Sequence, residues 1–282
     1  MANRYYSAYF KRITNKHDEP VKAALDGMIM YGVKQYEDNG IISALPTEQM
    51  TATLTNLHID AGTRWARYTD KDIKRKVSKK NAAIDNYNAF MREYLNRYLL
   101  SRSVKPIEET QRKIMAEIIA QGVEEGIGNN KIAARLRSLT ENTARARLIT
   151  RTETGRAMNT GAMFAAANSG VVVNKVWDSA QSNRTRRIPR NQTDHLRMDG
   201  ISVPFNQPFF VPGMKGFEAM MYPCDPSASA MNVCNCRCVV AFIPTGELRQ
   251  PIGGNEFTEV ISFVTNNLVT LNNVLINLVS NG

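Results

Sequence analysis

The change of hydrophobic pattern at Gly170 constrains the fold of this 282-residue chain more than any other feature. Before Gly170, apolar residues recur at helical spacing over several long stretches. After it, short apolar runs alternate with prolines, glycines and polar loops, a pattern typical of strands joined by turns. The sequence therefore predicts an α+β protein, in which a helical N-terminal region is followed by a small α+β domain with a few antiparallel strands.

Three helical stretches are expected in the first hundred residues. Pro20 is placed to open the first, which ends near Asn39-Gly40, and Thr47 is a candidate N-cap for the second. The third, over residues 81–100, carries an apolar and aromatic stripe that is typical of a core-facing side. The stripe consists of Ile84, Tyr87, Phe90, Met91, Tyr94, Leu95 and Tyr98.

A short connection is expected at residues 101–106, then a helix over 107–123 and a shorter one over 131–139. Thr143 is a candidate N-cap for a long helix that ends before Gly170, a residue suited to the left-handed conformation after a helix. This helix is rich in small residues: Ala157, Gly161, Ala162, Ala165, Ala166 and Ala167. Small side chains permit a neighbouring helix or sheet to approach closely.

Two strands are expected, over 171–177 and 233–243, and Pro244-Thr245-Gly246 should end the second. The patterns divide the chain into three parts: a helical N-terminal region (1–105), an α+β domain (106–246) and an apolar, Asn-rich C-terminal tail (247–282). The tail carries no charge after Glu259, so we expect it to dock either on the protein's own body or on a partner.

The net charge of +10 is concentrated in residues 1–197. This asymmetry is consistent with contact to a polyanion or to an acidic protein surface, and equally with a solubilising surface rich in Lys and Arg. No apolar run approaches the length that spans a bilayer, and no apolar segment of a secretory signal follows Met1, so we expect synthesis in the cytosol and no membrane partner.

An ordered set of short motifs spans Arg151 to Cys238. In sequence order they are Arg151-Thr152-Glu153-Thr154, Trp177-Asp178, Arg184-Thr185-Arg186, Asp194-His195-Leu196 with Asp199-Gly200, Tyr222-Pro223-Cys224-Asp225-Pro226, and Asn235-Cys236-Arg237-Cys238. Their order and spacing resemble the Mu protein F-like head-morphogenesis domain of phage minor head proteins, over about residues 107–243.

The resemblance implies a structural protein of a tailed bacteriophage and not an enzyme. Such a protein is made in the host cytoplasm, resides in the virion at the head interior or portal vertex, and acts in head assembly or genome delivery. The implied partners are the portal protein and double-stranded genomic DNA, bound without sequence preference. The major capsid or scaffolding protein is a further candidate partner.

Basic residues in two stretches are the candidates for DNA contact, because nonspecific binding needs only a density of Lys and Arg facing phosphates. These residues are Arg64, Arg67, Lys71, Lys74, Arg75, Lys76, Lys79, Lys80, Arg184, Arg186, Arg187 and Arg190. The alternatives are a solvated surface and a surface that faces an acidic protein.

One histidine and the clustered cysteines form a candidate metal site: His195, Cys224, Cys234, Cys236 and Cys238. If residues 234–238 lie on a strand, their three thiols share one face, and with His195 or Cys224 a subset could supply the nitrogen and sulfur ligands that zinc prefers. In the alternative, the thiols pack as small apolar side chains and His195 bonds Asp178 or Asp199. No other cofactor is expected.

A nucleic-acid-processing enzyme centred on His195 and the Arg184–Arg197 loop is the competing function. In that interpretation the histidine acts as a general base and the arginines neutralise phosphate. No second histidine lies close to it in the sequence, since His17 and His58 are in the other half of the chain, and no carboxylate pair at helical spacing or phosphate-binding loop accompanies it. We therefore expect no catalytic residue.

Overall fold

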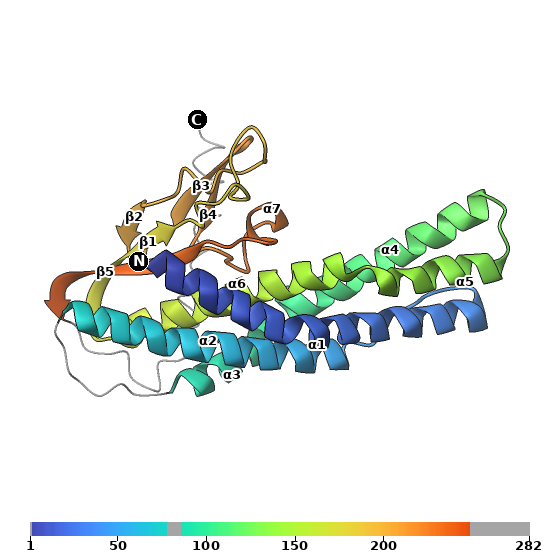
Figure 1. Cartoon of the computed structure of the whole chain (residues 1–282), viewed down its shortest axis with the longest axis horizontal. Coiled ribbons are helices and arrows are strands. Elements are labelled where there is room, and N and C mark those ends of the chain that lie inside the picture. Colours follow the sequence, from blue (N-terminus) through green and yellow to red (C-terminus); the bar gives the residue numbers. More distant parts are fainter. Residues whose placement is uncertain (1, 78–85, 249–282) are drawn as a thin grey trace, which may run out of the picture.

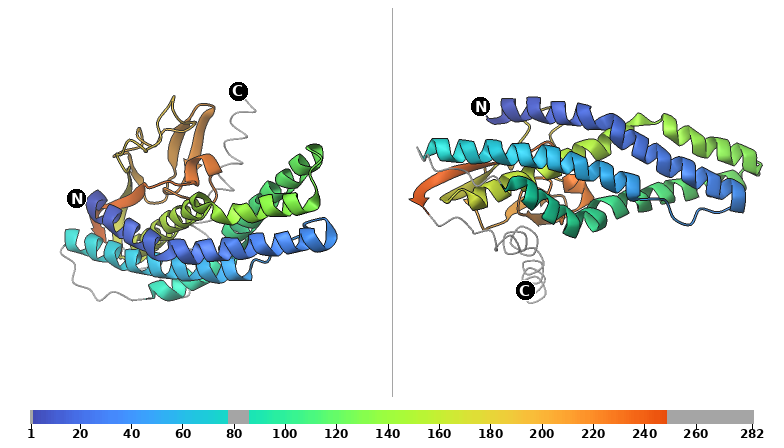
Figure 2. Two further views of the ribbon diagram at one scale, coloured as in Figure 1. Left: turned by 45° about the vertical axis from the view of Figure 1, so that its right-hand side comes forward. Right: turned by 90° about the horizontal axis from the view of Figure 1, so that it is seen from below.

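The computed structural model describes residues 2–77 and 86–248 and confirms the α+β fold. The helices lie side by side along the long axis of the molecule, and the strands gather over one end of this helical layer (Figure 1, Figure 2). The α-helices are α1 (Ala2–Asn39), α2 (Glu48–Lys76), α3 (Tyr87–Leu99), α4 (Lys105–Glu124), α5 (Asn129–Arg137), α6 (Thr143–Asn168) and α7 (Ala230–Val233). The strands are β1 (Val171–Asp178), β2 (Ser202–Pro204), β3 (Phe209–Gly213), β4 (Gly216–Met220) and β5 (Val239–Leu248).

Helix α1 does not begin at Pro20 but runs through it. Residues on both sides of the proline, such as Ile13 and Val21, are buried on one continuous face. Proline inside a helix removes one backbone hydrogen bond and costs about 3 kcal/mol. Burial of the apolar residues before and after Pro20 outweighs that cost, so the predicted helix start was wrong.

Residues 101–106 are not a connection. A π-helical turn, Leu100–Val104, joins α3 directly to α4, and Ser103 and Val104 are buried in it. The aromatic stripe of α3 packs into the core as predicted, with the ring of Phe90 stacked 3.6 Å from that of Phe164. The predicted start of this helix, at residues 81–85, lies outside the described residues.

Helix α6 is the central element of the fold, because it is buried on every side from Thr152 to Ala167. Its N-cap is Asn142 and not Thr143, since the Asn142 side chain accepts a hydrogen bond from the N–H of Ala144 (3.0 Å). Gly170 has the left-handed conformation expected after the helix, with φ of +67°. The small residues of α6 do allow close approach, and α2 crosses it so tightly that a Cβ on Gly161 would lie 2.3 Å from the carbonyl oxygen of Gly62.

The strands form a three-stranded antiparallel sheet in the order β2-β1-β5 and a separate hairpin, β3-β4. Strand β1 lies where it was predicted, but β5 begins six residues later than the expected start at Val233, because residues 230–233 form the short helix α7. Strand β5 also continues through Pro244, which pairs opposite Val173. A proline is tolerated there because β5 is an edge strand.

One hydrophobic cluster extends from Tyr6 in α1 to Phe242 in β5, so the helical region and the α+β domain share a core. A second cluster surrounds Trp177 and includes Phe209, Met220 and three cysteines. Within the described part of the chain, none of the helices has the length and apolar character needed to cross a membrane. The predicted C-terminal tail lies outside the described residues from residue 249 onward.

Candidate metal centre and basic surface

His195 lies between β1 and β2 and is 1% exposed. Its backbone N–H donates to the carbonyl of Arg186 (3.0 Å), and the indole of Trp177 packs edge-on against the imidazole, with ring centroids 5.2 Å apart. The ring Nε2 lies 2.8 Å from Oδ1 of Asn232, whose amide group in turn donates to Glu218. Asn232, which the sequence did not single out, therefore holds the imidazole in place of the expected aspartates.

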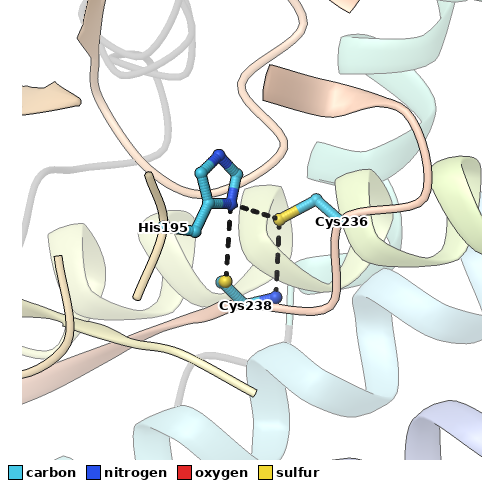
Figure 3. Close-up of side chains that lie close together, drawn as sticks. All are labelled: His195, Cys236 and Cys238. Atoms are coloured by element: carbon cyan, nitrogen blue, oxygen red, sulfur yellow. Dashed lines mark hydrogen bonds between the residues drawn. The ribbon is translucent and has the colours of Figure 1, made fainter. Parts of the chain in front are cut away.

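Two thiols face the other ring nitrogen of His195, Nδ1 (Figure 3). Cys236 Sγ lies 3.5 Å and Cys238 Sγ 3.6 Å from this nitrogen. The three donor atoms lie within 4.8 Å of one another, and all three side chains are buried. The structure thus brings together His195 and two of the four cysteines predicted as metal ligands.

Helix α6 holds the segment that carries these thiols. The hydroxyl of Thr152 accepts from the backbone N–H of Asn235 (2.9 Å). The side chain of Asn159 donates to the carbonyl of Cys238 (3.2 Å) and accepts from the N–H of Val240 (2.8 Å). Two polar side chains of α6 thereby fix an irregular segment at the point where β5 begins.

The other two cysteines differ from each other. Cys224 is buried, and its thiol donates to the carbonyl of Cys236 (3.8 Å). Cys234 lies outside the cluster and lines a surface pocket together with Arg145. The prediction that residues 234–238 form a strand with three thiols on one face was wrong, because the chain turns at Asn235, whose φ is +58°.

The three buried thiols, those of Cys224, Cys236 and Cys238, differ in the direction of their pKa shifts. Hydrogen bonds with Cys224 and then Cys238 lower the pKa of the Cys236 thiol well below its ordinary value. The hydrogen bond with Cys236, together with burial, raises the pKa of Cys224, and the same two causes raise that of Cys238. Cys236 is therefore the first of the three to become a thiolate.

A second buried polar cluster surrounds Glu153 of the Arg-Thr-Glu motif. The Glu153 carboxylate lies 2.9 Å from His58 Nε2 and accepts hydrogen bonds from Ser103 (2.8 Å) and Arg156 (2.8 Å). Burial raises the pKa of Glu153, but the charge of Arg156 and the hydrogen bond with His58 outweigh burial and leave the pKa below its ordinary value. This cluster ties α2, the π-helical turn and α6 together.

The predicted DNA-binding residues of the β1–β2 loop fall into two groups. Arg186 donates to the carbonyls of Asn232 and Cys234, and Arg190 donates to the carbonyl of Thr185 (2.7 Å), so both arginines hold the loop in shape. Arg184 and Arg187 have exposed side chains. These two arginines can reach a ligand in solution.

Arg184 belongs to a cluster of arginines that the sequence did not reveal. Burial lowers the pKa of the Arg237 guanidinium, and the nearby positive charges of Arg151 and Arg184 lower it further. Arg184, Arg186 and Arg237 also line one small pocket beside His195. Arginines from three motifs that lie far apart in the sequence therefore converge and repel one another, an arrangement that favours the binding of an anion.

The predicted DNA-binding residues of α2 are partly neutralised by their own helix. Ion pairs join Arg64 to Asp60, Lys74 to Asp70, and both Arg75 and Lys76 to Asp72. Arg67 and Lys71 have exposed side chains, while Lys79 and Lys80 lie outside the described residues. The α2 stretch is consequently a weaker anion-binding surface than its count of basic residues indicates.

Lys175 of β1 is fully buried, and its ammonium donates to the carbonyl of Met221 (2.7 Å). Burial lowers the pKa of Lys175 to about 7. Between pH 7 and the ordinary lysine pKa, the unfolded chain then binds more protons than the folded one, so the free energy of unfolding rises with pH.

Replacing Lys175 with methionine should remove this contribution, which reaches at most about 1.4 kcal/mol per pH unit. The variant is expected to be less pH-dependent than the wild type between pH 7 and 9, as measured by urea denaturation. Lys215→Met, a change at an exposed lysine, is the control and should keep the wild-type slope. Parallel curves for the wild type and Lys175→Met would contradict the prediction.

The comparisons with known proteins agree with the resemblance read from the motifs. Residues 113–241 match the family model described as Phage Mu protein F like protein. Neither the search of curated proteins nor the search of solved structures found a match. The matched residues begin in α4 and end in β5, and they include His195, Cys236, Cys238 and the three clustered arginines.

Proposed function

We propose that this chain, of which residues 113–241 match the phage Mu protein F-like family model, is a phage head-morphogenesis protein that acts as a minor head protein of a tailed bacteriophage. In this proposal the protein resides at the portal vertex, binds the portal protein, and acts in head assembly or genome delivery. The observation that carries the proposal is the family match, which covers every motif from Arg151 to Cys238.

The placement of His195 favours a structural role over a catalytic one. A general base must come within hydrogen-bond reach of the proton that it removes from a substrate. The imidazole of His195 is buried, with Asn232 at one nitrogen and two thiols at the other. In the proposed role this histidine holds the domain together and does not react with a nucleic acid.

Packaged DNA is the anion that best fits the cluster of Arg151, Arg184 and Arg237. The cluster contains only positive side chains that repel one another, and a phosphate group would relieve this repulsion. Guanidinium groups bind phosphate oxygens in a bidentate manner without reading the base sequence. We therefore propose that this arginine cluster, and not the α2 stretch, makes the main DNA contact.

Replacing Arg151, Arg184 and Arg237 with glutamine is expected to weaken binding to double-stranded DNA. Each lost phosphate contact removes about one unit from the slope of log affinity against log salt, so the triple variant should lose about 3 units. Fluorescence anisotropy with a labelled duplex of arbitrary sequence, repeated over a range of salt concentrations, measures this slope.

The matched control removes the same number of charges from arginines that already have acidic partners. Arg97, Arg135 and Arg137 pair with Glu93, Glu125 and Glu37, respectively. Their triple glutamine variant should keep most of the wild-type slope. Equal losses in the two triple variants would show that net charge, and not the cluster, governs DNA binding.

The wider proposal is tested in infected cells. Affinity capture of the tagged protein should recover the portal protein, and purified virions should contain the tagged chain. Virions that lack the chain, or turnover of a nucleic acid by the purified protein, would contradict the proposed function.

A further inference from the structure

The cluster of His195, Cys236 and Cys238 has the dimensions of a zinc site. Zinc binds histidine nitrogen at about 2.0 Å and cysteine sulfur at about 2.3 Å in a tetrahedron, which places nitrogen and sulfur about 3.5 Å apart. The distances from His195 Nδ1 to the two sulfurs are 3.5 and 3.6 Å. These three residues also form part of the lining of the small pocket that Arg184, Arg186 and Arg237 share, which has a volume of about 20 Å³, room for one water-sized species.

Hydrogen bonding alone accounts poorly for this arrangement. A neutral imidazole has one lone pair at its acceptor nitrogen, so it can accept well from only one of two thiols at similar distances. A metal ion accepts electron pairs from all three donor atoms at once. We propose that His195, Cys236 and Cys238 bind a zinc ion, and that this site is structural.

The surroundings of His195 fix the imidazole in the form that binds metal. The side-chain amide of Asn232 donates to the Glu218 carboxylate, so its oxygen must face the imidazole. His195 Nε2 is then the protonated ring nitrogen and donates a hydrogen bond to Asn232. This assignment leaves the lone pair of Nδ1 directed at the two sulfurs. Histidine ligands of zinc commonly donate their other ring N–H to an oxygen acceptor, and the amide oxygen of Asn232 is that acceptor here.

Cys224 lies beside these donors, but its sulfur is outside the group of three atoms that lie within 4.8 Å of one another, so in this proposal its side chain has to move toward the ion to become the fourth ligand. Its side chain is buried and its thiol lies against Cys236, to whose carbonyl it donates. Gly155 of α6 makes room for this approach, because a Cβ there would lie 2.9 Å from Cys224 Sγ. A set of three thiols and one imidazole is a common structural zinc site.

The burial of the donors distinguishes a structural ion from a catalytic one. A catalytic zinc keeps an open position for water or substrate, whereas a structural zinc is enclosed by protein ligands. None of the four side chains is more than 2% exposed. The ion would join the β1–β2 loop, the turn after β4 and the segment just before β5.

The test is the metal content of the purified full-length protein, prepared without chelators and reconstituted with one equivalent of zinc. We expect about one zinc per chain by elemental analysis in the wild type, and at least a tenfold lower content in Cys236→Ser. Substitution by Co²⁺ should give the intense visible bands of a tetrahedral thiolate site. This measurement on the wild type keeps the proposal testable even if a cysteine variant fails to fold.

Cys234→Ser is the matched control, because Cys234 lies two residues from Cys236 but outside the cluster. It should retain the wild-type zinc content and the cobalt spectrum. Less than half an equivalent of zinc in the reconstituted wild type would overturn the proposal, and so would an equal loss of metal in Cys234→Ser and Cys236→Ser. The proposal is independent of the proposed function, since the metal content is measured without DNA or portal protein.

Discussion

Replacing Gly161 with alanine should lower the free energy of unfolding by about 3 kcal/mol, the upper end for an overpacked core. The added Cβ would lie 2.3 Å from the carbonyl oxygen and 2.9 Å from the carbonyl carbon of Gly62. Both atoms belong to the backbone, so no flexible side chain can move aside. To relieve these clashes, helices α2 and α6 must move apart. The contact between these two helices is the most extensive one between helices in the described structure.

Urea denaturation followed by circular dichroism measures this change. Gly128→Ala is the matched control, because a Cβ there meets no atom within 4 Å and the residue has an ordinary φ of −69°. Its free energy of unfolding should fall by no more than about 1 kcal/mol, the cost of a poorer N-cap residue at the start of α5. A similarly small effect at Gly161 would show that α2 and α6 are not packed as described.

Replacing Glu153 with alanine is expected to cost about 3–5 kcal/mol, because it leaves the charge of Arg156 buried without its carboxylate. It also removes the acceptor for Ser103 and the partner of His58. The measurement is again the free energy of unfolding at neutral pH. Thermal melts of the same variants provide a second readout.

Two controls separate this cause from a general loss of charge. Glu125→Ala breaks an exposed ion pair with Arg135 and should leave the free energy of unfolding close to the wild-type value. The double variant Glu153→Leu, Arg156→Met removes both buried charges and should recover most of the stability. If the double variant is as unstable as Glu153→Ala, the unpaired charge of Arg156 is not the cause.

Local patterns predicted the parts of this fold that local forces determine. The end of α6 at Gly170 and the β1 strand depend on nearby residues and were predicted correctly. The start of α1 and the supposed connection at residues 101–106 were wrong, because packing across the molecule overrides the preferences of Pro20 and of the polar residues around Ser103.

In the candidate site, too, the sequence predicted what depends on nearby residues and missed what depends on packing between distant segments. His195, Cys236 and Cys238 could be grouped from residue type and spacing, although the expected strand was wrong and Cys234 lies elsewhere. Asn232 and the convergence of Arg237 with Arg151 could not be predicted, because they depend on how α6 packs against the segment before β5. Neither leaves a local pattern in the sequence.

The enclosure of α6 makes the residues matched by the family model depend on the helices that precede them. Gly161 lies inside residues 113–241, while Gly62, against which it packs, lies outside them in α2. A larger residue at either position has to be offset by a change in the other helix. We therefore expect the residues at these two positions to vary together among relatives, and we expect residues 113–241 joined to an unmatched α2 to give a less stable protein.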